Sequence, residues 1–312
     1  MAPAVSVIVP AHRVTAYIAA TLDSVLAQTR QDFEIVVVND GCPDTAGLER
    51  VLESYRDRIV YRRQAAGGPS AARNTGIATA RGACLAFLDG DDLWEPTFLD
   101  VMLAHLEADP TVAMAFADSQ PFGTGTEAGS LFAQVPPQGP CDLAGILVGR
   151  HVVVTSTTVA RRQAVLDAGG FDPALRHCED YDLWLRLAAR GAVVCERRVL
   201  GRRRLHPTSQ SSSPETMLRA QIAVRRRFVA AAALPPDVVA AAAAMDRRCE
   251  AEIALAEARR ALLAGDVGAA RAALSAAARA RPSVKLTAIL RLLALSPSAA
   301  VALHRWRHRS PA

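Results

Sequence analysis

An acidic cluster that follows an apolar segment is the strongest chemical signal in the sequence. Asp89, Asp91 and Asp92 place three carboxylates within four residues, directly after the apolar run 84–88. Such carboxylates repel one another unless a cation lies between them, and hard oxygen ligands suit Mg²⁺ or Mn²⁺ bridging to phosphate oxygens. The alternative is an acidic turn that caps a following helix, because Asp is a favourable N-cap residue. Taken alone, the cluster is compatible with both interpretations.

Another carboxylate, Asp40, follows the β-type run 33–38. At the carboxyl end of a strand, a carboxylate can accept a hydrogen bond from a nucleobase N–H or a sugar hydroxyl. An ordinary Asx turn explains the same residue equally simply.

Glu179 and Asp180 begin a segment with helical spacing, in which Leu183, Trp184 and Leu187 form the apolar stripe. A carboxylate at a helix N-terminus is stabilised in its charged form, so it is ready to accept a proton. Helix capping alone is the competing explanation.

A basic segment, Arg202-Arg-Arg-Leu-His206, precedes a serine-rich stretch. A histidine beside arginines suits contact with a diphosphate or a metal ion. A solvated basic turn followed by a linker would carry the same residues.

The segments around these signals alternate between β-type and helical patterns, which predicts a parallel sheet covered by helices on both faces. Ligands bind such sheets at the carboxyl ends of the strands, where the acidic residues lie. A Gly-, Pro- and Ser-rich segment is expected to be a loop or flap at 120–140. The predicted strands span 5–9, 33–38, 59–61, 84–88, 112–117, 152–159 and 193–203, and the predicted helices span 15–28, 48–55, 71–80, 96–108, 161–168 and 180–190.

Length and composition limit the class of protein. The 312 residues, 51% hydrophobic and 21% charged, suit one large core or two smaller ones and exclude wholesale disorder. No apolar run approaches the ~18 residues of a membrane-spanning helix, and no secretory leader is recognisable. Six scattered cysteines without a C-x-x-C pair predict reduced thiols, buried as small apolar residues, in a cytosolic protein.

The net charge of +5 hides an asymmetry near residue 213. From Ser213 onward, 16 basic residues face 7 acidic ones, a balance of +9, whereas the preceding part has 20 against 24, a balance of −4. The later part is rich in Ala and Arg and predicts helices at 217–233, 236–263, 267–280 and 284–295. We therefore expect two domains, 1–213 and 214–312, the second being a helical extension.

In their order along the chain, the motifs resemble those of the family-2 glycosyltransferases with the GT-A fold. This resemblance covers about two thirds of the chain and implies an α/β fold, a Rossmann-like and mostly parallel sheet flanked by helices, with an α-helical C-terminal extension. The matching segments are Val5-Ser-Val-Ile-Val-Pro10, Val36-Val-Val-Asn-Asp-Gly41, Ala71-Ala-Arg-Asn74, Phe87-Leu-Asp-Gly-Asp-Asp92, Gly169-Gly-Phe-Asp172 and Glu179-Asp-Tyr-Asp-Leu-Trp184.

The resemblance implies a donor site built from five residues. Pro10 and Ala11 would line the nucleobase pocket, and Asp40 would hydrogen-bond the base. Arg73 would help to hold the donor, and Asp89 would lie near the ribose.

It also implies the groups that act on the reaction. Asp91 would bind the metal ion, Mn²⁺ or Mg²⁺, that bridges the diphosphate, with His206 as a further contact to the metal or diphosphate. Asp180 would be the catalytic base, with Glu179 beside it.

The implied activity is inverting transfer of a sugar from a nucleoside diphosphate, UDP on family grounds, to a hydroxyl of a glycan, lipid-linked or other acceptor, as in polysaccharide biosynthesis for the cell envelope. A single in-line displacement inverts the anomeric centre and needs one carboxylate base. The alternatives are a non-catalytic glycosyltransferase-like binding protein and a sugar-nucleotide nucleotidyltransferase. The second would be expected to carry a Gly-rich, Lys-containing loop near the first strand, and the sequence lacks one. An NAD-dependent oxidoreductase is disfavoured because G-x-G-x-x-G is absent.

The Arg-rich C-terminal region allows three interpretations. Its helices could pack on the catalytic domain or pair protomers, or it could attach electrostatically to anionic lipid through the stretch 286–295 and Trp306. Nucleic-acid binding is not expected, because there is little aromatic interleaving and no recognised module. The expected location is the cytoplasm, with peripheral contact at the inner face of the membrane.

Overall fold

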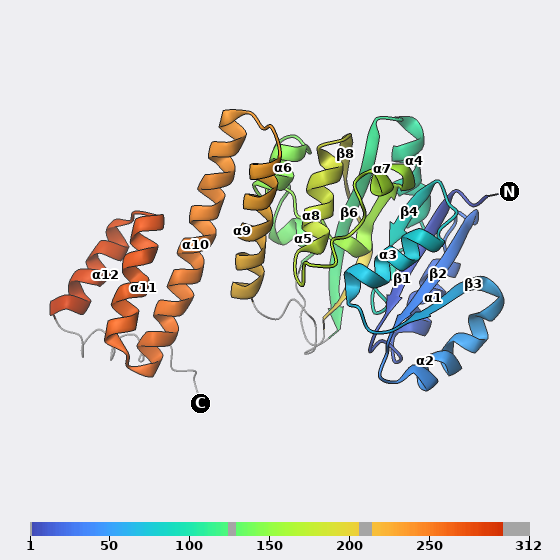
Figure 1. The fold of residues 1–312 in the computed structure, drawn as a ribbon, viewed down its shortest axis with the longest axis horizontal. Coiled ribbons are helices and arrows are strands. Elements are labelled where there is room, and N and C mark those ends of the chain that lie inside the picture. Colours follow the sequence, from blue (N-terminus) through green and yellow to red (C-terminus); the bar gives the residue numbers. More distant parts are fainter. Residues whose placement is uncertain (1, 124–128, 206–213, 296–312) are drawn as a thin grey trace. The chain divides into compact units, whose positions relative to one another are not determined.

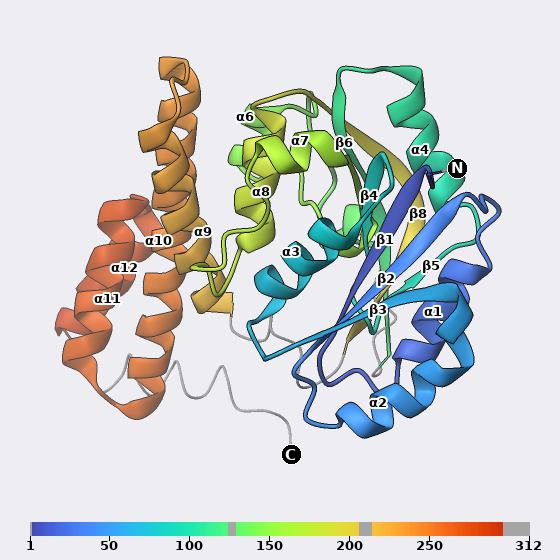
Figure 2. The same ribbon diagram turned by 45° about the vertical axis from the view of Figure 1, so that its right-hand side comes forward.

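The computed structural model describes residues 2–123, 129–205 and 214–295. The chain separates into two compact units, Met1–Ser209 and Gln210–Ala312. Figures 1 and 2 show both as ribbons. The first unit is built on a sheet, and the described residues of the second are largely helical.

Eight strands of the described chain form one sheet in the order β3-β2-β1-β4-β7-β6-β8-β5. β1 pairs in parallel with β2 and β4, and β2 pairs in parallel with β3, so the carboxyl ends of these strands meet at one edge. β7 runs antiparallel to β4 and β6, whereas β6 and β8 are parallel. The strands are β1 Val5–Ala11, β2 Phe33–Asp40, β3 Ile59–Gln64, β4 Cys84–Phe87, β5 Leu93–Trp94, β6 Val112–Gly123, β7 Thr158–Arg161 and β8 Ala192–Leu205.

Helices cover both faces of this sheet (Figure 2). α1, α2 and α4 pack on one face and share its core, whereas α3 and α8 lie on the other face. The helices of the first unit are α1 Ile18–Leu26, α2 Thr45–Leu52, α3 Pro69–Thr79, α4 Phe98–Ala108, α5 Leu131–Gln134, α6 Leu143–Leu147, α7 Arg162–Asp167 and α8 Glu179–Ala188, with 3₁₀ turns at Glu53–Arg58 and Thr155–Thr157.

Alternate residues of the central strands face the two helical layers. In β2, Ile35 and Val37 belong to the core shared with α1, α2 and α4, whereas Val36 and Val38 pack against Ala72 of α3. Burial of each such aliphatic side chain contributes roughly 1.5–3 kcal/mol. Because both faces are covered, the strand reads as a continuous apolar run rather than as an alternating one.

Helix α3 approaches the sheet closely at Gly76. A Cβ atom at this position would lie 2.4 Å from Cγ2 of Ile8 in β1. Only glycine therefore allows α3 to lie this close to the strand, and α3 carries one of the candidate site residues, Arg73.

Two expectations for the middle of the sheet are wrong. Of the expected strand 152–159, only the last two residues are extended, as the start of β7, and a 3₁₀ turn precedes them. The hydroxyl of Thr157 donates to the carbonyl of Ala117 at 2.8 Å, and the hydroxyl of Thr158 donates to the carbonyl of Val154 at 2.8 Å. These bonds stabilise the turn in place of a strand. The expected loop 120–140 contains the end of β6 and the short helix α5, which is capped by Ser130. Residues 124–128 lie outside the described residues.

The six cysteines are free thiols, as expected, but they are not all buried. Cys141 and Cys195 are half-buried. The Cys141 thiol, with a smaller contribution from His151, lowers the pKa of Cys195 to about 6. The expectation of small buried apolar residues therefore holds for the other four cysteines only.

The second unit consists of α9 Pro214–Ala231, α10 Pro236–Ala264, α11 Val267–Ala280 and α12 Val284–Leu295 over its described residues. α10 ends at Gly265, whose φ of +82° favours glycine, and Asp266 then caps α11 by accepting from the Ala269 N–H at 2.9 Å. A small apolar core joins α10, α11 and α12. Among the described residues, no helix combines the length and apolar character needed to cross a bilayer.

Candidate active site

The acidic turn at 89–92 leaves β4 at the sheet edge where β1 also ends. A Cβ atom on Gly90 would lie 2.9 Å from the carbonyl oxygen of Pro10, so the turn lies directly against the end of β1. The next residues form β5, and α4 begins only at Phe98. The turn is therefore not the N-terminal cap of a helix, which removes the simpler explanation of the acidic cluster.

Asp92 is buried within this turn and accepts a hydrogen bond from the backbone N–H of Arg204 at 2.7 Å. Burial raises the pKa of Asp92 to about 8, and the charges of Asp89 and Asp91 add to the shift. The negative charges of Asp89 and Asp91 thus disfavour ionisation of Asp92. A bound divalent cation would offset that charge.

Arg204 in β8 ties the turn to the far side of the sheet. Its Nε donates to the backbone carbonyl of Asp91 at 2.9 Å. Its guanidinium lies over the rings of Tyr17 and Phe122, 4.6 and 4.4 Å from their centroids. The sequence singled out this basic segment only as a whole, and pairing between strands far apart in the chain was needed to identify this one arginine.

Arg73 connects the acidic turn to α8. Its side chain is 6% exposed and contacts Asp89 at 2.7 Å and Glu179 at 2.9 Å. Burial opposes the charge of Arg73, but Asp89 and Glu179 outweigh it and raise the pKa of the guanidinium. For Glu179, burial and the charge of Asp180 raise the pKa, and Arg73 opposes this shift. Three of the predicted site residues, Arg73, Asp89 and Glu179, therefore lie in contact.

Asp180 is more exposed than Glu179 and is oriented by different partners. The hydroxyl of Thr155 donates to its Oδ2 at 2.9 Å, and the N–H of Tyr181 donates to Oδ1 at 2.7 Å. Neighbouring Ser156 accepts from the N–H of Asp89 at 3.2 Å. The 3₁₀ turn that holds this Thr-Ser pair therefore contacts both acidic motifs. Sequence reasoning missed these two residues because it placed them in a strand.

Asn74 joins two of the segments that carry the family resemblance. Its side chain donates to the carbonyl of Phe171 at 2.7 Å and accepts from the N–H of the same residue at 2.9 Å. Gly170, with φ of +68°, leaves the space that this contact requires, since a Cβ atom there would lie 2.7 Å from Asn74 Oδ1. The reciprocal pair fixes the chain that leads into α8.

Asp40 lies at the end of β2, and its carboxylate already has three donors. The N–H groups of Gly67 and Gly68 and the side-chain amide of Gln64 each donate to it at 2.8 Å. Asp40 therefore orders the chain that enters α3. A carboxylate offers about four lone-pair positions, so one contact to a base remains compatible with this geometry.

Pro10 and Ala11 lie at the end of β1, opposite Val38 and Asn39 of β2. Pro10 is partly exposed, whereas Ala11 is completely buried. Pro10 can thus present its ring at the surface of the edge, and any contribution of Ala11 comes from its backbone.

The donor set suits a metal ion that is shared with a substrate. Among the described residues, no three His, Cys, Asp or Glu side chains are arranged to hold an ion by themselves. Mg²⁺ is commonly bound by one or two carboxylates together with substrate phosphates, so Asp91 and a diphosphate form a sufficient set. The raised pKa of Asp92 fits this interpretation. His206 lies outside the described residues.

The buried ion pairs of Arg73 lead to a stability prediction. Arg73→Ala leaves Glu179 buried without a cation, and we expect the free energy of unfolding to fall by roughly 3–5 kcal/mol. Because Glu179 then has a pKa raised further above its usual 4.5, the folded state binds a proton that the unfolded state releases. The loss should therefore grow as the pH rises above about 5, which urea denaturation at several pH values would measure.

Arg73→Lys retains a positive charge and should lose less stability than Arg73→Ala at pH 8. Equal stability of Arg73→Ala and the parent protein at that pH would contradict the assignment of these ion pairs.

Comparison with known proteins identifies the family. The sequence model described as Glycosyl transferase family 2 matches residues 6–164, half of the chain, which include β1 to β4 and the acidic turn. The chain belongs to glycosyl transferase family 2. The resemblance predicted from the motifs is thereby confirmed.

Proteins named as glycosyltransferases match parts of the chain. The uncharacterized glycosyltransferase EpsJ of Bacillus subtilis is 52% identical over 97 residues, covering 30% of this chain and 27% of that protein. An uncharacterized glycosyltransferase of Rickettsia typhi is 28% identical over 216 residues, covering 68% of this chain and 67% of that protein. The chain spans only 27% of the length of the Bacillus subtilis relative and 34% of the length of a relative from Rickettsia felis.

Solved structures share the fold over nearly the whole chain. Residues 1–349 of S. aureus TarS in complex with UDP-GlcNAc give a TM-score of 0.64 at 17% identity, covering 98% of this chain and 92% of that one. The mannosyltransferase PcManGT from Pyrobaculum calidifontis, in complex with GDP-Man and Mn²⁺, gives 0.65 at 19% identity, covering 99% and 89%. The predicted GT-A fold with a helical C-terminal region is confirmed by these likenesses.

Proposed function

We propose that the protein is an inverting glycosyltransferase that moves a sugar from a nucleoside diphosphate to an acceptor hydroxyl with the help of Mn²⁺ or Mg²⁺. Family membership and the nucleotide-sugar complexes of the structural neighbours support this class of donor. UDP is the proposed carrier. The proposed acceptor is a hydroxyl of a glycan or of a lipid-linked sugar.

One observation carries the proposal: the acidic turn and the start of α8 meet around a single buried arginine. Arg73 contacts Asp89 on one side and Glu179 on the other, and Asp180 follows directly on α8. Arg73, the proposed contact to the donor, and Asp180, the proposed base, would thereby act at the same end of the sheet. Inverting transfer requires both groups near the same anomeric carbon.

Asp180 is the proposed base. Its carboxylate would take the proton of the acceptor hydroxyl as that oxygen attacks the anomeric carbon and the bond to the diphosphate breaks. Thr155 and the N–H of Tyr181 hold the carboxylate in one orientation. Glu179 is engaged by Arg73, so it positions the start of α8 rather than accepting the proton.

Asp91 would hold the metal ion at the diphosphate, and Asp89 would lie near the ribose of the donor. When bound, the ion would neutralise the charge that gathers on the leaving group. The contact from the Arg204 side chain to the backbone carbonyl of Asp91 supports this turn.

A panel of nucleotide sugars tests the proposed function. With Mn²⁺ or Mg²⁺ present, slow release of nucleoside diphosphate from one donor is expected even without an acceptor. A coupled assay for the released diphosphate would measure it. Donor binding without any release, with or without acceptors, would instead support a glycosyltransferase-like binding protein. Release of pyrophosphate from a nucleoside triphosphate, with transfer of the nucleotidyl group to a sugar phosphate, would support a nucleotidyltransferase.

Thr155→Val tests the orientation of the base. Loss of the hydrogen bond to the carboxylate should lower kcat by roughly tenfold and leave the KM for the donor nearly unchanged. Steady-state kinetics with varied donor concentration would measure both kcat and KM.

Thr155→Ser keeps the hydroxyl and should restore most of the activity. A kcat of Thr155→Val equal to that of the parent protein would show that Thr155 does not orient the base.

Three further assignments are part of the proposal. The catalytic domain would be 1–213, with 214–312 as a helical extension. The tail at 296–312, including Trp306, lies outside the described residues, and its contact with anionic lipid remains a prediction. A cytoplasmic location, with synthesis of cell-envelope polysaccharide at the inner membrane face, would give the protein access to nucleotide sugars.

A further inference from the structure

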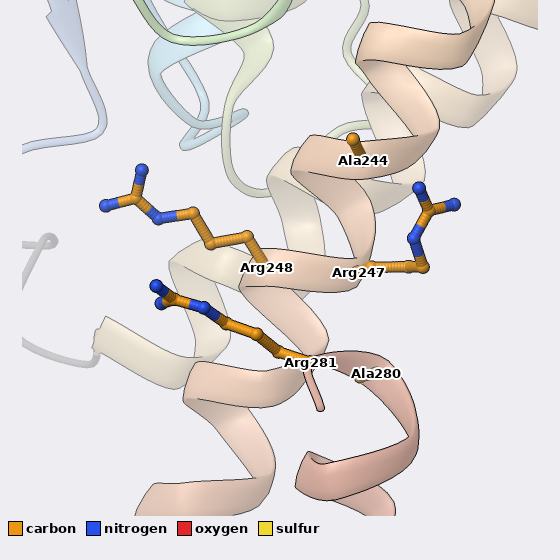
Figure 3. A pocket seen from close by; sticks show the side chains of 5 residues that line it. All are labelled: Ala244, Arg247, Arg248, Ala280 and Arg281. Atoms are coloured by element: carbon orange, nitrogen blue, oxygen red, sulfur yellow. The ribbon is translucent and has the colours of Figure 1, made fainter. Parts of the chain in front are cut away.

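A pocket in the helical unit is lined mainly by arginines. It has a volume of about 370 Å³, lies between α10 and the end of α11, and is lined by Ala244, Arg247, Arg248, Ala280 and Arg281. Figure 3 shows the side chains of Arg248 and Arg281 extending in the same direction from neighbouring helices, whereas Arg247 points to the other side. The two alanines keep the space between the helices open.

The charges of this pocket are not balanced by the surrounding residues. Within the described part of the chain, Arg247 and Arg281 have no ion-pair partner. Arg248 contacts only Glu252, at 3.4 Å, through side chains that are 62% and 48% exposed. Exposed pairs of this kind contribute little, at most about 1 kcal/mol.

Other arginines of the same unit are paired with carboxylates. Arg225 forms a buried ion pair with Asp246, and Arg226 contacts the same carboxylate at 3.0 Å. Arg219 contacts Glu257 at 2.5 Å. These pairs account for several arginines of the unit but not for Arg247 and Arg281 of the pocket; over the described residues, the exposed Arg259 and Arg271 likewise have no ion pair.

Helix electrostatics explain part of this cluster only. Arg281 follows the last turn of α11, where the helix dipole favours a cation. Arg247 and Arg248 lie in the middle of α10, where the dipole offers no such stabilisation. Guanidinium groups that line the same pocket repel each other, and an anion with several oxygens would relieve that repulsion by accepting hydrogen bonds from both.

We propose that the pocket between α10 and α11 binds phosphate groups, with Arg248 and Arg281 as the principal ligands. The guanidinium fork matches the oxygens of a phosphate, and the same chemistry is offered by a phospholipid headgroup and by a soluble phosphate compound. The site is separate from the proposed transfer reaction and does not depend on it.

Binding to the full-length protein tests the site with two probes. Tripolyphosphate binding is measured by isothermal titration calorimetry, and lipid binding by sedimentation with vesicles of equal parts phosphatidylglycerol and phosphatidylcholine. The pocket variant is Arg248→Gln/Arg281→Gln. The matched control, Arg259→Gln/Arg271→Gln, removes the same two charges from exposed positions on the same two helices. Glutamine retains helix propensity, and circular dichroism confirms that the variants fold.

The pocket variant should lose about tenfold or more in affinity for at least one probe, whereas the control variant should stay within about twofold of the parent protein. Loss with vesicles alone identifies a lipid headgroup as the ligand, and loss with tripolyphosphate identifies a soluble phosphate compound. The proposal is overturned if both variants lose affinity equally, if neither does, or if the parent protein binds neither probe.

Discussion

Asp180→Asn is expected to lower kcat for sugar transfer by about 10²–10⁴-fold while donor affinity stays within about twofold. Asparagine keeps the size of the side chain and can still accept from the Thr155 hydroxyl, but it cannot take a proton at neutral pH. The acceptor hydroxyl would then attack without assistance. Single-turnover kinetics, together with calorimetric titration of the nucleotide sugar, would separate the chemical step from binding.

Asp167→Asn is a matched control, because this exposed carboxylate of α7 lies outside the proposed site and, among the described residues, accepts only from Gln163. This variant should leave both kcat and donor affinity unchanged. Turnover of purified Asp180→Asn close to that of the parent protein would show that Asp180 is not the base. Glu179→Gln would then be the next variant to examine.

Asp91→Ala is expected to weaken donor binding in the presence of Mn²⁺ by at least about tenfold, since even the loss of a group that only supports a metal ligand costs 10–100-fold. Binding measured without metal should change much less, because the carboxylate acts through the ion. Calorimetric titrations of the nucleotide sugar with and without Mn²⁺ would give the difference.

Asp57→Ala removes an exposed carboxylate far along the chain from the acidic turn and controls for net charge. Its Mn²⁺-dependent affinity should equal that of the parent protein. If Asp91→Ala also keeps the full metal-dependent gain in affinity, Asp91 is not a metal ligand. The proposed role of the acidic turn would then be lost.

Much of the first unit could be predicted from sequence because its signals are local. The continuous apolar runs that became β1, β2 and β4 report burial on both faces, and that pattern is present in the residues themselves. The acidic residues that follow two of these strands were therefore placed correctly at the carboxyl edge of the sheet. The fold class followed from the same alternation of segments.

The prediction of secondary structure is wrong where side chains compete with the backbone for hydrogen bonds. The segment 152–159 has β-type composition, yet the hydroxyls of Thr157 and Thr158 bond to carbonyls and the chain forms a 3₁₀ turn instead. For this reason the sequence did not identify Thr155 as a site residue, since its hydrogen-bond partner is a carboxylate 25 residues away. Short elements such as α5 were missed because four residues carry too little periodicity to recognise.

The sequence by itself determined which residue types are available for chemistry and which strands they follow. Both follow from local properties, namely the apolar pattern of each strand and the polar residues at its end. Only the tertiary structure decided how those residues combine. Arg73 lies between Asp89 and Glu179, the latter 106 residues away, and Arg204 reaches the acidic turn across 112 residues. Such contacts arise when the sheet brings distant segments to one edge, and no periodicity within a segment encodes the partner it will meet.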